Sequence, residues 1–393
     1  MDNEYTYLLH LLGAYLREES PAPAENVDWG KLLELARVHS VVGIVGYMGR
    51  KYDICPDYRY ADDFRRLCMG TISIYSQRHT MALEMVRQLE QAGIDHILMK
   101  GFVIREYYPI PELRTFTDID IVIRPEDRIK CHSLMQTLGY KSKEDWEPVY
   151  SYYRGDEYYE IHTQIMEIDV SDKADYRGYF TNTWENVCMV SPHGYRFAPE
   201  FHFLYMLTHI AKHIQGTGAG VRMYMDVAAF IRHHSKNMDW VWVEKELRKL
   251  SLFDFSRVVL SEVEQWFGVN KPFAFQPVSE EVLDNFARFT VEAGTFGRYG
   301  RDGALAKMKH QEKTDSNSRA SLLLQQIFPD AETIQARYTY LRDKPWLLPV
   351  AWVHRWIKTS GETRNHLNLA RQIVQADMEE VDRLRKLIKD IGL

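Results

Sequence analysis

The chain has 393 residues, which exceeds one ordinary hydrophobic core, so two or three subdomains are expected. Its net charge of −6 argues against a general nucleic-acid-binding protein, because such proteins are usually basic. The four cysteines are far apart in the sequence, which disfavours a zinc cage or a disulfide framework and fits a cytoplasmic location.

Residues 1–92 have the pattern of helices. In the first segment, apolar residues recur every three or four positions, from Tyr7 to Tyr15. A longer amphipathic segment covers about 61–92 and stops at Gly93, a residue type that commonly ends helices. We therefore expect a helical N-terminal region, residues 1–92, that leads directly into a strand over 94–99.

The predicted strand over 94–99 ends at Lys100 and Gly101. A glycine permits a tight strand-to-helix turn and the close approach of a phosphate to backbone amides. Lys100 would supply a countercharge for that phosphate, although it could instead pair with a carboxylate. A short helix over 102–107 should follow and end at the prolines Pro109 and Pro111.

The segment 117–123 alternates strictly between two kinds of residue. In an extended strand, Ile119, Ile121 and Ile123 lie on one face. The two aspartates, Asp118 and Asp120, lie on the other face. The two aspartates are then about 7 Å apart at Cα, so they repel unless they are solvated or share a cation. A phosphate-binding turn together with paired carboxylates suits metal-assisted phosphoryl or nucleotidyl transfer.

Two further elements complete the predicted core, residues 93–195. A helix should begin near Pro125, pack through Ile129 and two leucines, and end at Gly139. A strand over 156–162 follows, and its alternation places Glu160 on a polar face, either as a third acid beside the aspartates or as the partner of a basic residue. Arg114, in the loop before the aspartates, could hold a triphosphate or brace the turn over 108–111.

The region 196–393 is again helical in pattern. His209 and His213 have the spacing of zinc ligands, but Ile210 stands where a zinc protease has glutamate, so packing is favoured over a role in a substrate cleft. Arg222 and Asp226 are spaced as a local ion pair on a helix. The segment 294–303 is rich in glycine and arginine and predicts a mobile loop, at best a lid.

The C-terminal part contains a short apolar run and, at its end, a charged helical pattern. The most apolar run, residues 346–353, is too short to span a bilayer and contains a proline. A charged amphipathic helix is expected from Met378 onward. We therefore expect no membrane partner.

The order of the motifs resembles the uncharacterised nucleotidyltransferase family of the polymerase β-like nucleotidyltransferase superfamily. The motifs are Met99-Lys100-Gly101, Tyr108-Pro109, Arg114, Asp118-x-Asp120, Tyr159-Glu160-Ile161-His162, His209 with His213, and Arg222 with Asp226. They cover roughly residues 95–230. The superfamily usually has Gly-Ser after the first strand, whereas Lys100-Gly101 stands here, which matches this branch.

The resemblance implies an α+β fold with a small mixed sheet flanked by helical regions. It also implies a Mg²⁺-dependent transferase, with two ions expected and Mn²⁺ as a possible substitute, that moves a nucleoside monophosphate from an NTP such as ATP to an acceptor hydroxyl and releases pyrophosphate. Asp118, Asp120 and Glu160 would be the catalytic and metal-binding acids, with Glu160 either a metal ligand or the base that takes the acceptor's proton. Lys100, Gly101 and Arg114 would bind the nucleotide, and Arg222 with Asp226 would brace the core against the C-terminal helices. The acceptor could be a small molecule, RNA or a protein.

Two other functions fit the same residues. The chain could be a catalytically inactive family member that acts as an interaction module, in which case the acids would bind no metal tightly. It could also be a metal-dependent phosphohydrolase that uses water where the transferase uses an acceptor. Product analysis separates hydrolysis, which yields free nucleotide, from transfer, which yields a modified acceptor.

Overall fold

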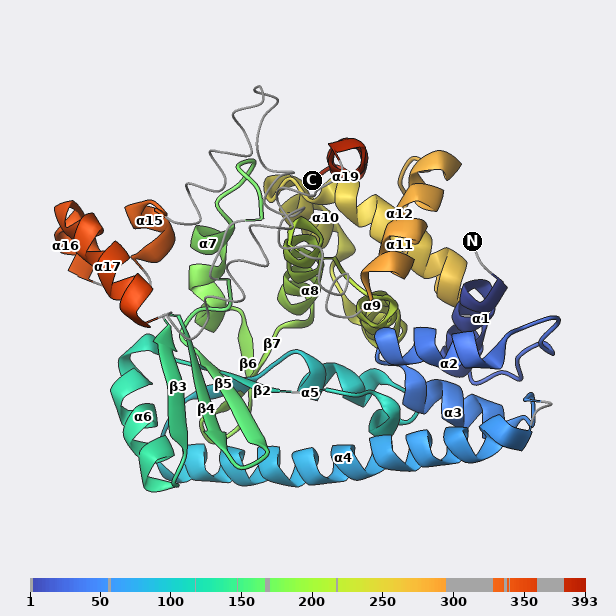
Figure 1. Ribbon diagram of the computed structural model, residues 1–393, viewed down its shortest axis with the longest axis horizontal. Coiled ribbons are helices and arrows are strands. Elements are labelled where there is room, and N and C mark those ends of the chain that lie inside the picture. Colours follow the sequence, from blue (N-terminus) through green and yellow to red (C-terminus); the bar gives the residue numbers. More distant parts are fainter. Residues whose placement is uncertain are drawn as a thin grey trace.

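The computed structural model describes residues 3–55, 58–116, 118–146, 148–166, 170–216, 218–294, 328–335, 338, 340–358 and 378–393. The fold is α+β, as predicted: one mixed sheet lies among helices that precede and follow it in sequence (Figure 1). Most of the predicted lid, residues 295–303, lies outside the described residues. Among the described helices, none has the length and apolarity needed to cross a lipid bilayer.

Helices come first in the chain: α1 (Asn3–Arg17), α2 (Trp29–Val38), α3 (Val42–Lys51) and the long α4 (Tyr58–Gln91). The central elements are β1 (His96–Leu98), α5 (Gly101–Ile104), β2 (Ile119–Ile123), α6 (Arg128–Thr137), β3 (Lys141–Trp146), β4 (Val149–Arg154), β5 (Glu157–His162), α7 (Tyr176–Tyr179), β6 (Val187–Ser191) and β7 (Gly194–Phe197). The later helices are α8 (Pro199–Gln215), α9 (Val221–His234), α10 (Trp240–Lys249), α11 (Phe253–Phe267), α12 (Glu280–Ala293), α15 (Ala331–Ile334), α16 (Tyr340–Asp343), α17 (Leu348–Lys358) and α19 (Met378–Asp390).

The seven strands follow the order β3-β4-β5-β2-β1-β7-β6. The central strand β2 pairs antiparallel with β1 on one side and parallel with β5 on the other. In the β2–β5 register, Asp120 lies opposite Glu160. The sheet therefore places two of the predicted acids side by side, on strands that are forty residues apart in sequence.

The alternation predicted for β2 is confirmed. Its isoleucines are buried in a core with residues of α4, such as Met85 and Leu89. On the opposite face, Val122 belongs to the larger core that includes α8 and α9. Figure 1 shows α4 running beneath the sheet and the later helices above it. Because the isoleucines commit one face to α4, Asp120 must face the later helices.

Two parts of the sheet were not predicted. The strands β3 and β4 form an antiparallel pair at one edge, and β6 and β7 form another at the opposite edge. The predicted packing face of α6 was partly wrong, because Ile129 is 80% exposed whereas Cys131 and Met135 are buried. The α6 helix therefore packs through Cys131 and Met135, which belong to the same core as residues of α4 and the sheet.

The burial of the isoleucine face of β2 can be tested by replacing one buried and one exposed isoleucine with alanine. Ile121→Ala removes a side chain that is fully buried between the sheet and α4, and should lower the free energy of unfolding by about 2–5 kcal/mol. Ile129→Ala, the control at an exposed position of α6, should change it by less than about 0.5 kcal/mol. Urea denaturation measures both, and equal effects would contradict the assigned packing.

A buried acid on α11 makes stability depend on pH. Glu262 is almost fully buried, and neither carboxyl oxygen has a hydrogen-bond partner among the described residues. Burial raises the pKa of Glu262 from 4.5 to about 8, and Asp284 adds to the shift. The unfolded chain therefore releases this proton at lower pH than the folded chain does.

As a consequence, the free energy of unfolding should fall as pH rises from about 4.5 to about 8, by on the order of 1.4 kcal/mol per pH unit. Glu262→Gln should remove this dependence and stabilise the protein most at alkaline pH. Thermal unfolding across this range measures the effect. A variant whose melting temperature follows the same pH profile as the wild type would contradict the assignment.

Candidate functional site

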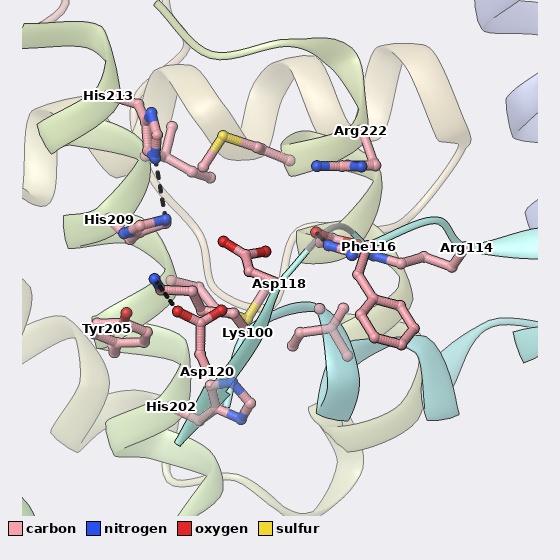
Figure 2. A pocket seen from close by; sticks show the side chains of 16 residues that line it. Lys100, Arg114, Phe116, Asp118, Asp120, His202, Tyr205, His209, His213 and Arg222 are labelled. Atoms are coloured by element: carbon pink, nitrogen blue, oxygen red, sulfur yellow. Dashed lines mark hydrogen bonds and ion pairs between the residues drawn. The ribbon is translucent and has the colours of Figure 1, made fainter. Parts of the chain in front are cut away.

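A cavity of about 220 Å³ lies between the end of β2 and the helices α8 and α9. Five of the six predicted site residues line it: Lys100, Gly101, Arg114, Asp118 and Asp120. Figure 2 shows the two aspartates between a wall with His209 and His213 and a wall with Arg222. Acidic and basic side chains thus face the same space.

Asp120 is the most buried acid of the site, with 2% exposure. Its Oδ1 accepts a hydrogen bond from Lys100 Nζ at 2.6 Å and another from His162 Nε2 at 3.0 Å. Burial favours the protonated carboxyl, but the positive charge of Lys100 and the bond from His162 outweigh it and hold the pKa of Asp120 well below its usual range. Asp120 is therefore ionised at neutral pH.

Glu160 lies next to Asp120 on β5, although it does not line the cavity. Its Oε1 accepts a hydrogen bond of 3.3 Å from the Tyr158 hydroxyl, and its Oε2 is 3.7 Å from His162 Nε2. Burial, followed by the charge of Asp120, raises the pKa of Glu160 to about 6. Its neighbours Tyr159 and Ile161 pack in the core on the α4 side, as the alternation of β5 predicts.

The donor atoms of Asp120, Glu160 and His162 lie within 4.8 Å of one another. The two carboxylates suit Mg²⁺ or Mn²⁺, whereas Nε2 of His162 is hydrogen-bonded to Asp120 in this structure. Asp118 is not part of this group but lines the adjoining cavity. The residues present therefore fit a divalent metal.

His162 was not predicted as a site residue, although its position two residues after Glu160 on one strand face was a usable signal. A carboxylate only accepts hydrogen bonds, so His162 donates through Nε2 to Asp120. In this arrangement His162 orients Asp120.

The turn after β1 is tight at Lys100 rather than at Gly101. Lys100 has φ 51° and ψ −132°, which side-chain-bearing residues rarely adopt. Gly101 is needed for space instead, because a Cβ there would lie 2.3 Å from Arg114 Nη1 and 2.8 Å from Phe116 Cβ. The missing side chain at 101 lets the Arg114 guanidinium reach its place in the cavity wall.

Arg114 joins the sheet region to α9 through a buried ion pair. Its guanidinium donates to both carboxylate oxygens of Asp226, at 3.1 Å from Nε and 2.6 Å from Nη2. The Tyr108 hydroxyl donates to the same carboxylate at 2.7 Å. Asp226 therefore pairs with Arg114, and the ion pair with Arg222 that the helical spacing predicted is not formed.

Arg222 was singled out in the sequence as a partner of Asp226, but it lines the cavity instead. Its Nη1 donates to the backbone oxygen of Thr115 at 3.2 Å and to the Thr115 hydroxyl at 3.1 Å. Its Nε is buried without a hydrogen-bond partner among the described residues. Burial and the nearby charge of Arg114 lower the pKa of Arg222 to about 10, so it remains a cation at neutral pH and faces the cavity (Figure 2).

Histidines of α8 form one wall of the cavity. The Nε2 atoms of His209 and His213 are 3.1 Å apart, so one ring donates and the other accepts. Burial first, and then the nearby His213 and Lys100, keep the pKa of His209 well below its usual value. These two histidines hydrogen-bond to each other, as the favoured interpretation of their spacing expects, and they also line the cavity.

The Arg114–Asp226 pair should contribute strongly to stability. Asp226→Ala leaves a buried guanidinium without its partner and should lower the free energy of unfolding by about 3–5 kcal/mol. The control is Glu244→Ala, which breaks an exposed pair with Arg248 on α10 and should cost at most about 1 kcal/mol. Urea denaturation compares them, and a small loss in both variants would show that the buried pair does not hold α9 in place.

A family model described as an uncharacterised nucleotidyltransferase matches residues 25–268. This span is more than half of the chain and includes the whole sheet and every residue that lines the cavity. No curated protein and no solved structure matches the chain. The resemblance read from the motifs is confirmed: the chain belongs to the uncharacterised nucleotidyltransferase family.

Proposed function

We propose that the protein is a Mg²⁺-dependent nucleotidyltransferase that moves a nucleoside monophosphate from an NTP to an acceptor hydroxyl and releases pyrophosphate. The observation that carries this proposal is the cavity, in which Asp118 and Asp120 face the cationic Arg222 across a space open to a ligand. Acids that can hold a metal and a cation that can hold phosphate are the two parts that such a transfer requires. Family membership supports nucleotidyl transfer in general.

Asp118, Asp120 and Glu160 would hold the metal through carboxylate oxygens. When bound, Mg²⁺ or Mn²⁺ supplies positive charge that orients the triphosphate and stabilises the charge that develops during transfer. His162 keeps Asp120 in place through its 3.0 Å hydrogen bond. The carboxylates alone lead us to expect two divalent metal ions at this site.

The phosphates would be held mainly by Arg222 and by the backbone at Gly101. Arg222 lines the cavity as a cation, and a guanidinium group matches phosphate oxygens in charge and geometry. Arg114 lines the cavity beside Arg222, but its guanidinium already donates two hydrogen bonds to Asp226. We therefore assign Arg114 a structural role in the cavity wall rather than the main phosphate contact. This changes the role that the sequence gave to Arg114.

As the alternative to holding the metal, Glu160 would take the proton of the acceptor hydroxyl. A carboxylate whose pKa is raised to about 6 is ionised at neutral pH and is a stronger base than an ordinary glutamate. In this step the acceptor oxygen forms a bond to the α-phosphorus, the bond from that phosphorus to the bridging oxygen breaks, and pyrophosphate leaves. The acceptor remains open among a small molecule, RNA and a protein, and a cytoplasmic location remains a prediction.

Linked binding of metal and nucleotide tests this function. Mg²⁺ and an NTP together should raise the melting temperature by more than the sum of their separate effects, because the metal is shared between carboxylates and phosphates. Asp120→Asn should abolish the joint effect, and Arg222→Met should weaken it by reducing NTP affinity. Thermal shift assays with each of the four NTPs, with Mg²⁺ and with Mn²⁺, measure this linkage.

The matched control is Asp95→Asn, which changes an acid next to β1 that pairs with Arg124 at 2.8 Å and does not line the cavity. It should keep the joint effect of metal and NTP. No joint effect with any NTP in the wild type would contradict the proposal and favour an interaction module. Free nucleoside monophosphate as the sole product of an α-labelled NTP would favour hydrolysis.

A further inference from the structure

We infer that the ammonium group of Lys100 takes the place of one of the two cations expected for this transfer, so that the site works with a single divalent metal. The inference rests on the proposed function and concerns how many metals the same site holds. It builds on the second of the two roles that the sequence suggested for Lys100, pairing with a carboxylate, rather than on contact with phosphate.

The backbone fixes Lys100 beside Asp120. The amide of Met99 donates to the backbone oxygen of Asp120 at 3.2 Å. Lys100 is therefore the residue after one that is hydrogen-bonded to β2. The φ of 51° at Lys100 is costly for a residue with a side chain, and such strain persists only where the surrounding structure imposes it. The strained turn directs the side chain to the acid rather than away from the sheet.

The Lys100 side chain is also mostly buried and is held at its ammonium end. Only a quarter of its surface is exposed, and Nζ lies 2.6 Å from Asp120 Oδ1. Figure 2 shows this ammonium group between the side chains of Tyr205 and His209 at the cavity wall. A lysine that served only as a mobile phosphate contact would not need this confinement.

Hydrogen bonding at Asp120 limits the number of metals that it can hold. Oδ1 already accepts from Lys100 and from His162, which uses both lone pairs of that oxygen. A carboxylate that bridges two cations commonly presents one oxygen to each, and here Oδ2 alone is left. Asp120 can therefore ligate one metal while Lys100 supplies the second positive centre on its other oxygen.

The charges agree with this count. As metal ligands, the carboxylates of Asp118, Asp120 and Glu160 would carry three negative charges, and Lys100 supplies one positive charge beside them. One divalent cation balances the two negative charges that remain, and the triphosphate then faces Arg222. A second divalent cation beside the Lys100 ammonium would experience strong repulsion at short range.

Counting bound Mn²⁺ tests the inference. Electron paramagnetic resonance, which detects free Mn²⁺, should give one bound ion per chain for the full-length protein saturated with a non-hydrolysable NTP analogue, each of the four bases being tried. Lys100→Met removes the charge while keeping the length of the side chain, and should raise the count to two. Lys130→Met, the control, changes a lysine on α6 that bonds to Gly93 outside the cavity, and should leave the count at one.

Each result has a distinct meaning. Two Mn²⁺ per wild-type chain would overturn the inference while leaving the proposed transfer intact. An unchanged count of one in a folded Lys100→Met variant, with circular dichroism matching the wild type, would also overturn it. The wild-type count needs no variant, so it decides the matter even if Lys100→Met does not fold. No bound Mn²⁺ in the wild type with any analogue would contradict the proposed function itself.

Discussion

The site depends on the burial of one face of β2. Three isoleucines pack against α4, and a shift of one residue would exchange the two faces of the strand and place aspartate in an apolar core. That cost fixes the register and directs Asp120 toward α8 and α9. The parallel pairing with β5 then brings Glu160 alongside. The hydrophobic face of one five-residue strand thereby positions the chemistry on its other face.

A second constraint closes the cavity from the helical side. The Arg114–Asp226 pair, with Tyr108 as a third partner, joins the loop before β2 to α9 inside the protein. Because this pair occupies Asp226, Arg222 one helical turn earlier is free to turn toward the cavity and bond to Thr115. The pairing of Asp226 with Arg114 therefore accounts both for the buried ion pair and for the position of Arg222 at the cavity.

The sequence predicted elements whose patterns are local and strong. The alternation in β2 and β5 identified both strands and the faces that carry Asp120 and Glu160. The edge strand β3 was missed because its sequence, Lys-Ser-Lys-Glu-Asp-Trp, is polar and has no alternating apolar face. The pair β6–β7 was missed for a related reason, since Met189 and Val190 are exposed and bury no continuous face.

The candidate site was harder to predict where tertiary contacts override local spacing. Arg222 and Asp226 are separated by one helical turn, which suggests a local pair, but a buried two-pronged contact with Arg114, 112 residues from Asp226, prevails. The partner of Lys100 likewise follows from the strained turn that brings it to Asp120, and no spacing rule reveals that turn. Such pairings require the packed chain.

The proposed transfer requires that this cavity binds an NTP through a metal held by the aspartates. The most direct measurement is a crystal structure with Mn²⁺ and a non-hydrolysable NTP analogue, with anomalous scattering locating the metal. We expect a Mn²⁺ peak bound by Asp118 and Asp120 and by phosphate oxygens, with the triphosphate on Arg222. A triphosphate bound elsewhere, or a metal that contacts neither aspartate, would contradict it.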